Sequence, residues 1–327
     1  MADPIRTDPR RIDVHQHLIP PERARAMAGR AAGLGWPAPV WDEASALAMM
    51  DRRSIATGVL SYAAPLAAPD DPDGARTGAR SVNEYTAELV KNRPDRFGLF
   101  AVLPLPDVDG ALAEAAHALD ELNADGVMVL SNAQGRYLGD PAFEPLWAEL
   151  DRRSAVVLVH PTAPPGPPGP PDPALPPAPL VDFPYDTTRT ALHLAMRGVP
   201  RRYPRIRMIL PHAGGFLPYA AHRLALAGHL DPDTTPEDFL TDLRSFYVDT
   251  ALAGSPATLP SLLAFADPER ILFGSDFPML PEEWGTGFDN GLDAYAGWGP
   301  GQLHAVNRGN AEALIPRLAA TVRSTAG

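Results

Sequence analysis

Cysteine is absent from this chain of 327 residues. Disulfides, thiolate metal ligands and cysteine nucleophiles are therefore excluded. Lysine is almost absent as well, because Lys91 is the only lysine among the 28 basic residues. Lys91 lies in the polar segment KNRPDR, where an exposed position is expected. We therefore do not expect catalysis through a Schiff base or a buried lysine.

Long apolar runs and excess positive charge are also missing. No run of 18 apolar residues occurs, and the N-terminal segment MADPIRTDPRRIDV has no apolar signal core. The 40 acidic residues outnumber the 28 basic ones, which gives a net charge of −12. Nucleic acids and anionic membranes both require a positive surface field. The composition therefore predicts a soluble, cytoplasmic protein that binds neither nucleic acid nor membrane.

Eight short apolar runs follow one another along the chain, separated by segments with helical periodicity. Near-continuous apolar runs are typical of parallel strands that are covered on both faces. Their alternation with helices predicts an α/β fold, a (β/α)8 TIM barrel, with residues 1–327 as a single domain. The alternative is an open doubly wound sheet, but no GxGxxG follows the first run. The runs are residues 11–18, 57–63, 97–104, 126–130, 155–161, 207–215, 246–252 and 271–278.

Two segments between the predicted elements are unusually long. Residues 18–45 follow the first strand and carry Trp36 and Trp41, and they form either a lid or a packing or dimer segment. Residues 161–184 follow the fifth strand, and 12 of these 24 residues are proline. Because three strands are still to come, we expect a stiff loop on the catalytic face and not an interdomain linker.

Residues that can carry chemistry gather at the ends of the predicted strands, where the active site of an α/β barrel forms. His15 and His17 end the first strand, His160 the fifth, His212 the sixth and Asp276 the eighth. The two-residue spacing of His15 and His17 puts both side chains on the inward face of their strand. Neutral imidazole and carboxylate are suitable ligands for a divalent metal ion. The set therefore predicts a metal centre.

Each of these residues has an alternative interpretation. Two histidines on one strand could each bond a carbonyl group, and Asp276 could cap the following helix. His212 is followed by Gly214 and Gly215, which permit close approach of the backbone to a ligand. It could be an acid/base residue, a fifth ligand or a structural histidine. Asp13 and Asp249, on the first and seventh strands, are expected to be buried structural acids.

The motifs IDVHQH, HPT, LPHAGG and FGSDFP occur in this order along the chain. With them the sequence resembles the amidohydrolase superfamily, in the branch of aminocarboxymuconate semialdehyde decarboxylase and the metal-dependent aromatic acid decarboxylases. The segments DFPYDTTRTALHL and GSDFP are most similar to 6-methylsalicylate decarboxylase-like members. The resemblance implies that His15, His17, His160 and Asp276 hold one divalent metal ion, most often Zn²⁺, with Mn²⁺ as the alternative. It also implies that His212 is the acid/base residue beside the ion.

The sequence departs from part of this branch at two positions. Several aromatic decarboxylases have Glu in place of the first histidine and another Glu three residues after the catalytic histidine. Here His15 and Gly215 stand at these positions, which matches the aminocarboxymuconate semialdehyde decarboxylase pattern better. No predicted strand carries a lysine that could be carbamylated to bridge two metals, so one metal ion is expected.

Two arginines are candidates for binding a substrate carboxylate. Arg189 is predicted in the first turn of a helix capped by Asp186 or a neighbouring threonine, where a cation opposes the helix dipole and needs an anion. The alternative is a salt bridge to Asp182 or Asp186. Related decarboxylases carry an arginine at the position of Arg223 that reaches into the neighbouring subunit's site, so the resemblance implies a homodimer. The alternative for Arg223 is an ordinary exposed helix residue.

The resemblance thus implies a metal-dependent, non-oxidative decarboxylase of a small hydroxyaromatic or related unsaturated carboxylic acid, similar to 6-methylsalicylate. The metal would act as a Lewis acid, and His212 or Asp276 would deliver a proton to the carbon that bears the carboxylate. The same ligands would serve a hydrolase of a lactone, ester or amide, which releases no CO₂. A binding protein without catalysis would hold no stoichiometric metal.

Overall fold

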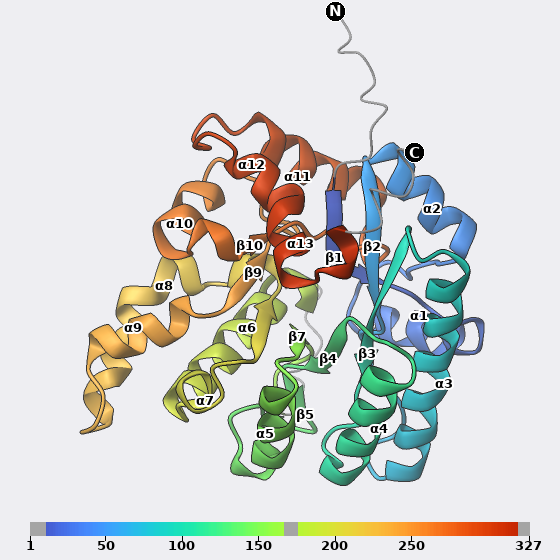
Figure 1. Ribbon diagram of the computed structural model, residues 1–327, viewed down its shortest axis with the longest axis horizontal. Coiled ribbons are helices and arrows are strands. Elements are labelled where there is room, and N and C mark those ends of the chain that lie inside the picture. Colours follow the sequence, from blue (N-terminus) through green and yellow to red (C-terminus); the bar gives the residue numbers. More distant parts are fainter. Residues whose placement is uncertain (1–10, 167–175, 320–327) are drawn as a thin grey trace, which may run out of the picture.

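The computed structural model describes residues 11–166 and 176–319. Eight parallel strands occupy the centre in sequential order, β1-β2-β3-β4-β7-β8-β9-β10, and helices surround them (Figure 1). This arrangement confirms the (β/α)8 barrel. A two-stranded hairpin, β5 (Asn132–Ala133) and β6 (Arg136–Tyr137), follows β4. The barrel strands are β1 (Arg11–His17), β2 (Ile55–Ser61), β3 (Phe97–Val102), β4 (Gly126–Leu130), β7 (Val156–His160), β8 (Arg207–Leu210), β9 (Tyr247–Asp249) and β10 (Ile271–Leu272).

Backbone hydrogen bonds close the barrel between the last strand and the first. The His17 N–H donates to the carbonyl of Phe277 at 2.7 Å, and the Asp276 N–H donates to the carbonyl of His15 at 2.8 Å. A closed sheet excludes the open doubly wound alternative. Closure also places the segment after β10 directly against the end of β1.

The strands are continuously apolar because the barrel interior covers one face and the helices cover the other. Every residue of β3 and β7 is buried. Burying a Val, Leu or Phe side chain contributes about 1.5–3 kcal/mol, so these runs supply much of the core's stability.

Helices form the outer layer, as Figure 1 shows. Two of them begin at capping boxes: Asp42 accepts from the N–H of Ser45, and Thr235 accepts from the N–H of Asp238. Within the described residues, no helix has the length and apolar character needed to cross a bilayer. The helices are α1 (Ala24–Gly33), α2 (Glu43–Arg52), α3 (Pro72–Asn92), α4 (Val108–Asp120), α5 (Glu144–Arg152), α6 (Ala178–Met196), α7 (Val199–Arg202), α8 (Leu217–Leu224), α9 (Pro236–Arg244), α10 (Thr258–Phe265), α11 (Glu282–Ala294), α12 (Gln302–His304) and α13 (Asn310–Leu314).

The long segment after β1 contains helix α1 and lies against the barrel mouth. The indole N–H of Trp36 donates to the carbonyl of Met279, which follows β10. Met27 on α1 and Trp41 beyond it are buried in the core. The segment therefore packs onto the barrel and covers the catalytic face at the same time.

The loop after β7 is shorter than the sequence predicts. Residues 167–175 lie outside the described residues, but α6 begins at Ala178, so a loop extending to residue 184 is wrong. Pro184 lies inside α6, where its ring removes the donor that would bond the carbonyl of Leu180. The helix forms nevertheless because one face of it, including Thr187 and Ala191, is fully buried.

Buried ion pairs connect β1 to the outer helices. Asp289 on α11 accepts from Arg53 Nε at 2.7 Å and from Arg53 Nη2 at 2.9 Å, and it lies 3.3 Å from Arg11 Nη1. All three side chains are less than a tenth exposed. Asp293 lies 2.7 Å from Arg11 Nη2, but its side chain is 41% exposed.

Replacing Asp289 tests how much these buried ion pairs contribute to the free energy of unfolding. Asp289→Asn leaves Arg53 buried without its counter-charge, so we expect the free energy of unfolding to fall by about 3–5 kcal/mol. Asp293→Asn is the matched control, and its cost is expected to stay below about 1 kcal/mol because the Asp293 carboxylate is 41% exposed and Arg11 keeps Asp289 as a partner. Urea unfolding followed by circular dichroism measures both. Equal losses in the two variants would contradict the assignment.

Candidate metal centre

Four potential ligands meet at the C-terminal ends of the barrel strands. His15 and His17 belong to β1, His160 ends β7, and Asp276 follows β10. One ligand atom from each lies within 4.8 Å of the others, and all four residues are buried. The structure thus brings together the four residues that the sequence predicts as metal ligands.

Two of the histidines are held in a metal-binding orientation by bonds to Nδ1. His15 Nδ1 lies 2.9 Å from Asp249 Oδ2, and His160 Nδ1 lies 2.8 Å from the carbonyl oxygen of Pro161. Carboxylate and carbonyl oxygens only accept, so Nδ1 carries the proton in both rings. When these rings are neutral, each Nε2 atom keeps its lone pair, which is the arrangement usual for a metal-bound histidine.

His17 has the same arrangement through a hydroxyl group. Its Nδ1 lies 2.9 Å from Ser61 Oγ, and its Nε2 lies 3.1 Å from His15 Nε2. Two lone pairs at that distance repel each other, so the pair needs either a proton on one of the two Nε2 atoms or a metal ion between them. The ring positions therefore favour a positively charged ligand.

Two buried atoms of the cluster make no hydrogen bond with the described residues: His160 Nε2 and Asp276 Oδ1. A buried polar atom without a partner costs about 1–3 kcal/mol. Ligand atoms around one zinc ion, each at about 2.1 Å, lie about 3–4 Å apart. Asp276 Oδ1 lies 3.3 Å from His15 Nε2 and 3.2 Å from His17 Nε2, so these residues fit a single metal ion.

The electrostatics of the cluster also favour a cation. Burial disfavours the charged form of His15, but the carboxylates of Asp249 and Asp276 outweigh burial and raise its pKa to about 10. Burial lowers the pKa of His17, and it holds the pKa of His160 well below the usual value. Neutral imidazole is the form that binds a metal ion. The carboxylates thus favour a positive charge beside them, which a proton on His15 supplies and which a metal ion bound by the neutral ring would supply in its place.

His212 lies beside the cluster, on the turn that follows β8. Its Nε2 lies 3.3 Å from Asp276 Oδ2, and its backbone N–H donates to Asp249 Oδ1 at 3.0 Å. Its Nδ1 is buried and has no hydrogen-bond partner among the described residues. His212 and Asp276 have φ values of 54° and 57°, a strained region in which non-glycine residues are concentrated at functional sites.

Asp13 and Asp249 are buried acids that bond to the backbone, as expected. Asp13 Oδ1 accepts from the N–H groups of His15 and Ser275, both at 3.0 Å, and burial raises its pKa to about 6. Asp249 accepts from the His15 ring and the His212 backbone. These two acids therefore position the cluster.

Gly215 permits a close approach of two backbone segments. Its φ is +67°, and a Cβ atom there would collide with the backbone carbonyl of Pro184 on α6. The close approach seen in the structure is between α6 and the turn of His212, and Gly215 also lines the wide pocket described below. Glycine here allows α6 to support the turn.

The structure does not bring Arg189 to the cluster. Because α6 begins at Ala178, Arg189 lies in the middle of the helix, and its predicted position in the first turn is wrong. It donates to Tyr185 Oη at 2.8 Å, and its guanidinium lies 5.5 Å from the centre of the Tyr137 ring. Among the described residues it forms no salt bridge with Asp182 or Asp186, so that alternative is also wrong.

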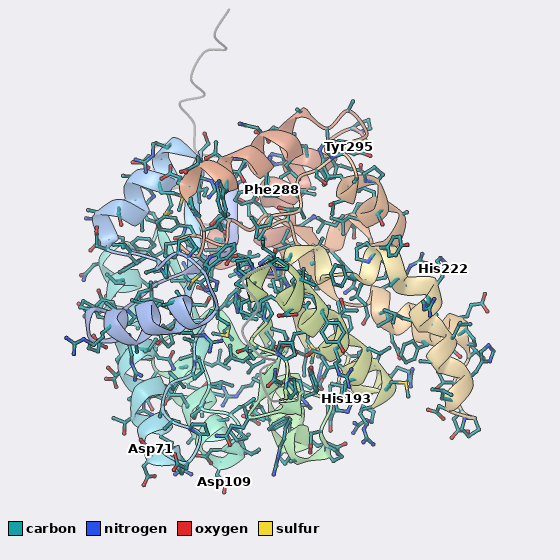
Figure 2. All side chains as sticks on the ribbon, turned by 180° about the vertical axis from the view of Figure 1, so that it is seen from behind. Asp71, Asp109, His193, His222, Phe288 and Tyr295 are labelled. Atoms are coloured by element: carbon teal, nitrogen blue, oxygen red, sulfur yellow. The ribbon has the colours of Figure 1, made fainter. Side chains whose placement is uncertain are left out.

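Arg223 lies near the end of α8 and is exposed. None of the hydrogen bonds or ion pairs found among the described residues involves its side chain. The contacts within one chain therefore give Arg223 no role in binding a substrate. The remaining histidines lie in helical segments, as expected, and Figure 2 shows two of them, His193 and His222, on the outer layer of helices.

A cavity of about 70 Å³ adjoins the cluster. It joins a wider pocket of about 700 Å³, with which it shares Trp36, Pro179, Leu180, His212 and Leu252. The residues around the smaller cavity come from the cluster, from the segment after β1 and from α6. They include His160, His212, Asp276, Met27, Arg30, Leu34, Trp36, Phe183, Leu252 and Met279.

The sequence analysis missed Arg30. The only available signal was the helical spacing of Met27, Ala31 and Leu34, which predicts one buried face on α1. Arg30 borders that face, but the spacing does not say what the face covers.

A barrel with a strand-end cluster of three histidines and one aspartate defines an enzyme of the α/β-barrel class with a metal-ligand site. The chain belongs to the amidohydrolase family, whose model matches residues 12–317.

Curated relatives are decarboxylases. The 6-methylsalicylic acid decarboxylase of Penicillium expansum is 38% identical over 319 residues, which cover 94% of this chain and 97% of that protein. The decarboxylase yanB of Aspergillus niger is 39% identical, covering 94% of this chain and 88% of that protein. The gamma-resorcylate decarboxylase of Rhodococcus jostii is 29% identical and covers 82% of this chain and 88% of that protein. These relatives confirm the prediction of a carboxy-lyase.

Solved structures agree with this assignment. A crystal structure described as amidohydrolase II is 32% identical, with a TM-score of 0.86 and coverage of 94% of this chain and 99% of that one. The crystal structure of 2,6-dihydroxybenzoate decarboxylase in complex with 2,6-dihydroxybenzoate is 26% identical, with a TM-score of 0.80 and the same coverage.

Metal content tests the cluster directly. We expect purified wild-type protein supplied with Zn²⁺ to retain about one ion per chain, because one cluster has four donors. His160→Ala removes a donor and is expected to retain none after gel filtration. Asp249→Asn presents an amide N–H to His15 Nδ1, which moves the ring proton to Nε2 and weakens metal affinity roughly 10–100-fold. Elemental analysis and competition with a chelator measure these effects.

His117→Ala is the matched control, because His117 lies on α4 outside the cluster. It is expected to retain the wild-type metal content. An undiminished metal content in His160→Ala would contradict the assignment.

Proposed function

We propose that this protein is a metal-dependent, non-oxidative decarboxylase of a small hydroxyaromatic carboxylic acid of the 6-methylsalicylate type. The observation that carries the proposal is the convergence of His15, His17, His160 and Asp276 beside His212 at one end of the barrel. Similarity to decarboxylases over 94% of the chain supports the reaction class.

The proposed cofactor is Zn²⁺, with Mn²⁺ as the alternative. His15, His17, His160 and Asp276 would hold it, because three neutral imidazoles and one carboxylate suit both ions. Bound there, the ion would supply Lewis-acid binding of the substrate's oxygen atoms.

His212 is the proposed acid. Asp276 Oδ2 lies 3.3 Å from its Nε2 and holds the ring in place. Protonated His212 would donate a proton to the ring carbon that bears the carboxylate. The bond from that carbon to the carboxylate would then break, its electron pair would return to the ring, and CO₂ would leave. The reaction balances without an oxidant or a reductant.

The cavity suits a small, mainly apolar acid. Met27, Leu34, Phe183 and Leu252 contribute apolar surface, and the cluster contributes polar groups on one side. Apolar walls with a few placed polar groups are typical of small-molecule sites. Phe183 also approaches the His160 ring edge-on, with 6.5 Å between ring centres.

The proposed decarboxylase releases CO₂ and 3-methylphenol in equal amounts from 6-methylsalicylate. His212→Gln removes the proton donor and keeps the proposed metal ligands, so we expect kcat to fall roughly 10²–10⁴-fold with metal content unchanged. CO₂ capture and chromatography of the phenol measure both products. His304→Gln, which replaces an exposed histidine on α12, is the matched control and is expected to keep wild-type activity.

Two outcomes would contradict the proposal. A metal-loaded wild-type protein that releases no CO₂ from any of a panel of hydroxybenzoates is not the proposed enzyme. Cleavage of a lactone, ester or amide by that protein would favour the hydrolase alternative.

We also propose a homodimer formed through α8 and the segment after it. Tyr219 is 91% exposed, Leu226 57% and Leu230 77%, and large exposed apolar patches mark interaction surfaces. Phe216 and Tyr219 also line the wide pocket that leads to the cluster. Arg223 lies between these residues in sequence and would extend toward the partner's pocket, where it could bind a carboxylate.

Sedimentation velocity tests the dimer. Tyr219→Glu places a charge in the proposed interface and is expected to shift the protein to the monomer, because burying an unpaired carboxylate is costly. Val40→Glu is the matched control, since Val40 is 77% exposed but lies on another segment. A wild-type monomer at micromolar concentration would overturn the dimer.

A further inference from the structure

Arg30 is a cation on the wall of the cavity that contains the proposed catalytic groups. It lies on α1 and is partly buried. The same cavity is lined by His160, His212 and Asp276. Within the described residues, Arg30 is the only arginine or lysine among those that line this cavity.

Most hydrogen-bond donors of the Arg30 guanidinium have no acceptor among the described residues. Its Nη2 donates to Thr162 Oγ1 at 2.7 Å, and that is the one hydrogen bond it makes with the described residues. It forms no ion pair with any acidic side chain in the described part of the chain. Of its five N–H donors, most are therefore left for another acceptor.

This lack of a counter-charge is costly for a guanidinium that is partly removed from solvent. Burial lowers the pKa of Arg30, which reports the loss of solvent around it, although arginine stays charged. A partly desolvated cation without an anion is unfavourable. An anionic ligand in the cavity would remove that cost.

Thr162 fixes Arg30 relative to the cluster. The residue follows His160 by two positions, and its backbone N–H lies 3.1 Å from Ser131 Oγ and 3.3 Å from Asp186 Oδ2. Asp186 is fully buried and also accepts from Tyr137 Oη at 2.8 Å. The guanidinium is thus attached to the same strand end that carries a proposed metal ligand.

We propose that Arg30 binds the substrate's carboxylate and is the residue that selects a carboxylic acid over the corresponding phenol. The proposal rests on the proposed function and adds a binding residue to it. A guanidinium binds a carboxylate through two parallel N–H bonds, and a phenol cannot accept such a pair. Loss of CO₂ removes the group that Arg30 holds, so the phenol product is bound less tightly and leaves.

Equilibrium binding separates the two ligands. In a metal-loaded His212→Gln background, in which turnover is slow, Arg30→Gln is expected to weaken binding of 6-methylsalicylate about 10–100-fold, because charge-assisted bonds are lost. Binding of 3-methylphenol is expected to change less than about twofold. Arg30→Lys keeps the charge without the planar fork and is expected to fall between the two. Isothermal titration calorimetry measures all three proteins.

Arg25→Gln is the matched control, because Arg25 lies on the same helix and is exposed. It is expected to leave both affinities unchanged. The thermal unfolding and the metal content of each variant are compared with those of the parent protein. If Arg30→Gln is destabilised, the two affinities of Arg30→Lys are compared with those of the parent instead. Equal weakening of both ligands, unchanged affinity for 6-methylsalicylate in both Arg30 variants, or no binding of 6-methylsalicylate by the parent would overturn the proposal.

The outcome also separates this proposal from the proposed function. If wild-type protein releases no CO₂ but binds 6-methylsalicylate in an Arg30-dependent way, the proposed carboxylate site is supported and the proposed reaction is contradicted. If wild-type protein releases CO₂ but Arg30→Gln keeps its affinity for 6-methylsalicylate, the proposed reaction is supported and the proposed carboxylate site is contradicted.

Discussion

The closure of the barrel is the constraint on which the rest of the site depends. The backbone bond from Asp276 to His15 joins the last strand segment to the first at 2.8 Å. It places Asp276 beside His15 and His17, although these residues lie at opposite ends of the sequence. His160 arrives from the far side because all parallel strands end at the same rim. Four donors from three segments therefore meet without any local motif that contains them all.

Asp249 connects the proposed metal site to the proposed acid through hydrogen bonds. One carboxylate oxygen holds the His15 ring, and the other holds the backbone of His212. The same acid thus fixes a ligand's tautomer and the strained turn that carries the proton donor. The buried carboxylates of Asp249 and Asp276 favour a positive charge between them, either a proton on His15 or a metal ion in its place. The surrounding hydrophobic barrel stabilises that arrangement, which would be costly on its own.

The segment after β1 gives the barrel its selectivity in this interpretation. Helix α1 brings apolar side chains and Arg30 to the mouth, and Trp36 ties the segment to the region after β10. The metal side of the cavity would act on the substrate's oxygens, and the α1 side would recognise its carboxylate. Helix α6 completes the wall and supports the turn of His212 through its contact at Gly215.

The sequence alone determined the barrel and brought forward the four candidate ligands, because apolar runs indicate the strands and strand ends in a parallel barrel share one rim. The tertiary structure decided the start of α6, where burial of one helix face outweighs the cost of Pro184. It also decided which arginine faces the cavity: Arg189 contacts two tyrosines, whereas Arg30 lines the cavity beside the cluster. Helical periodicity shows that α1 has a buried face, but only packing against the barrel decides what that face covers.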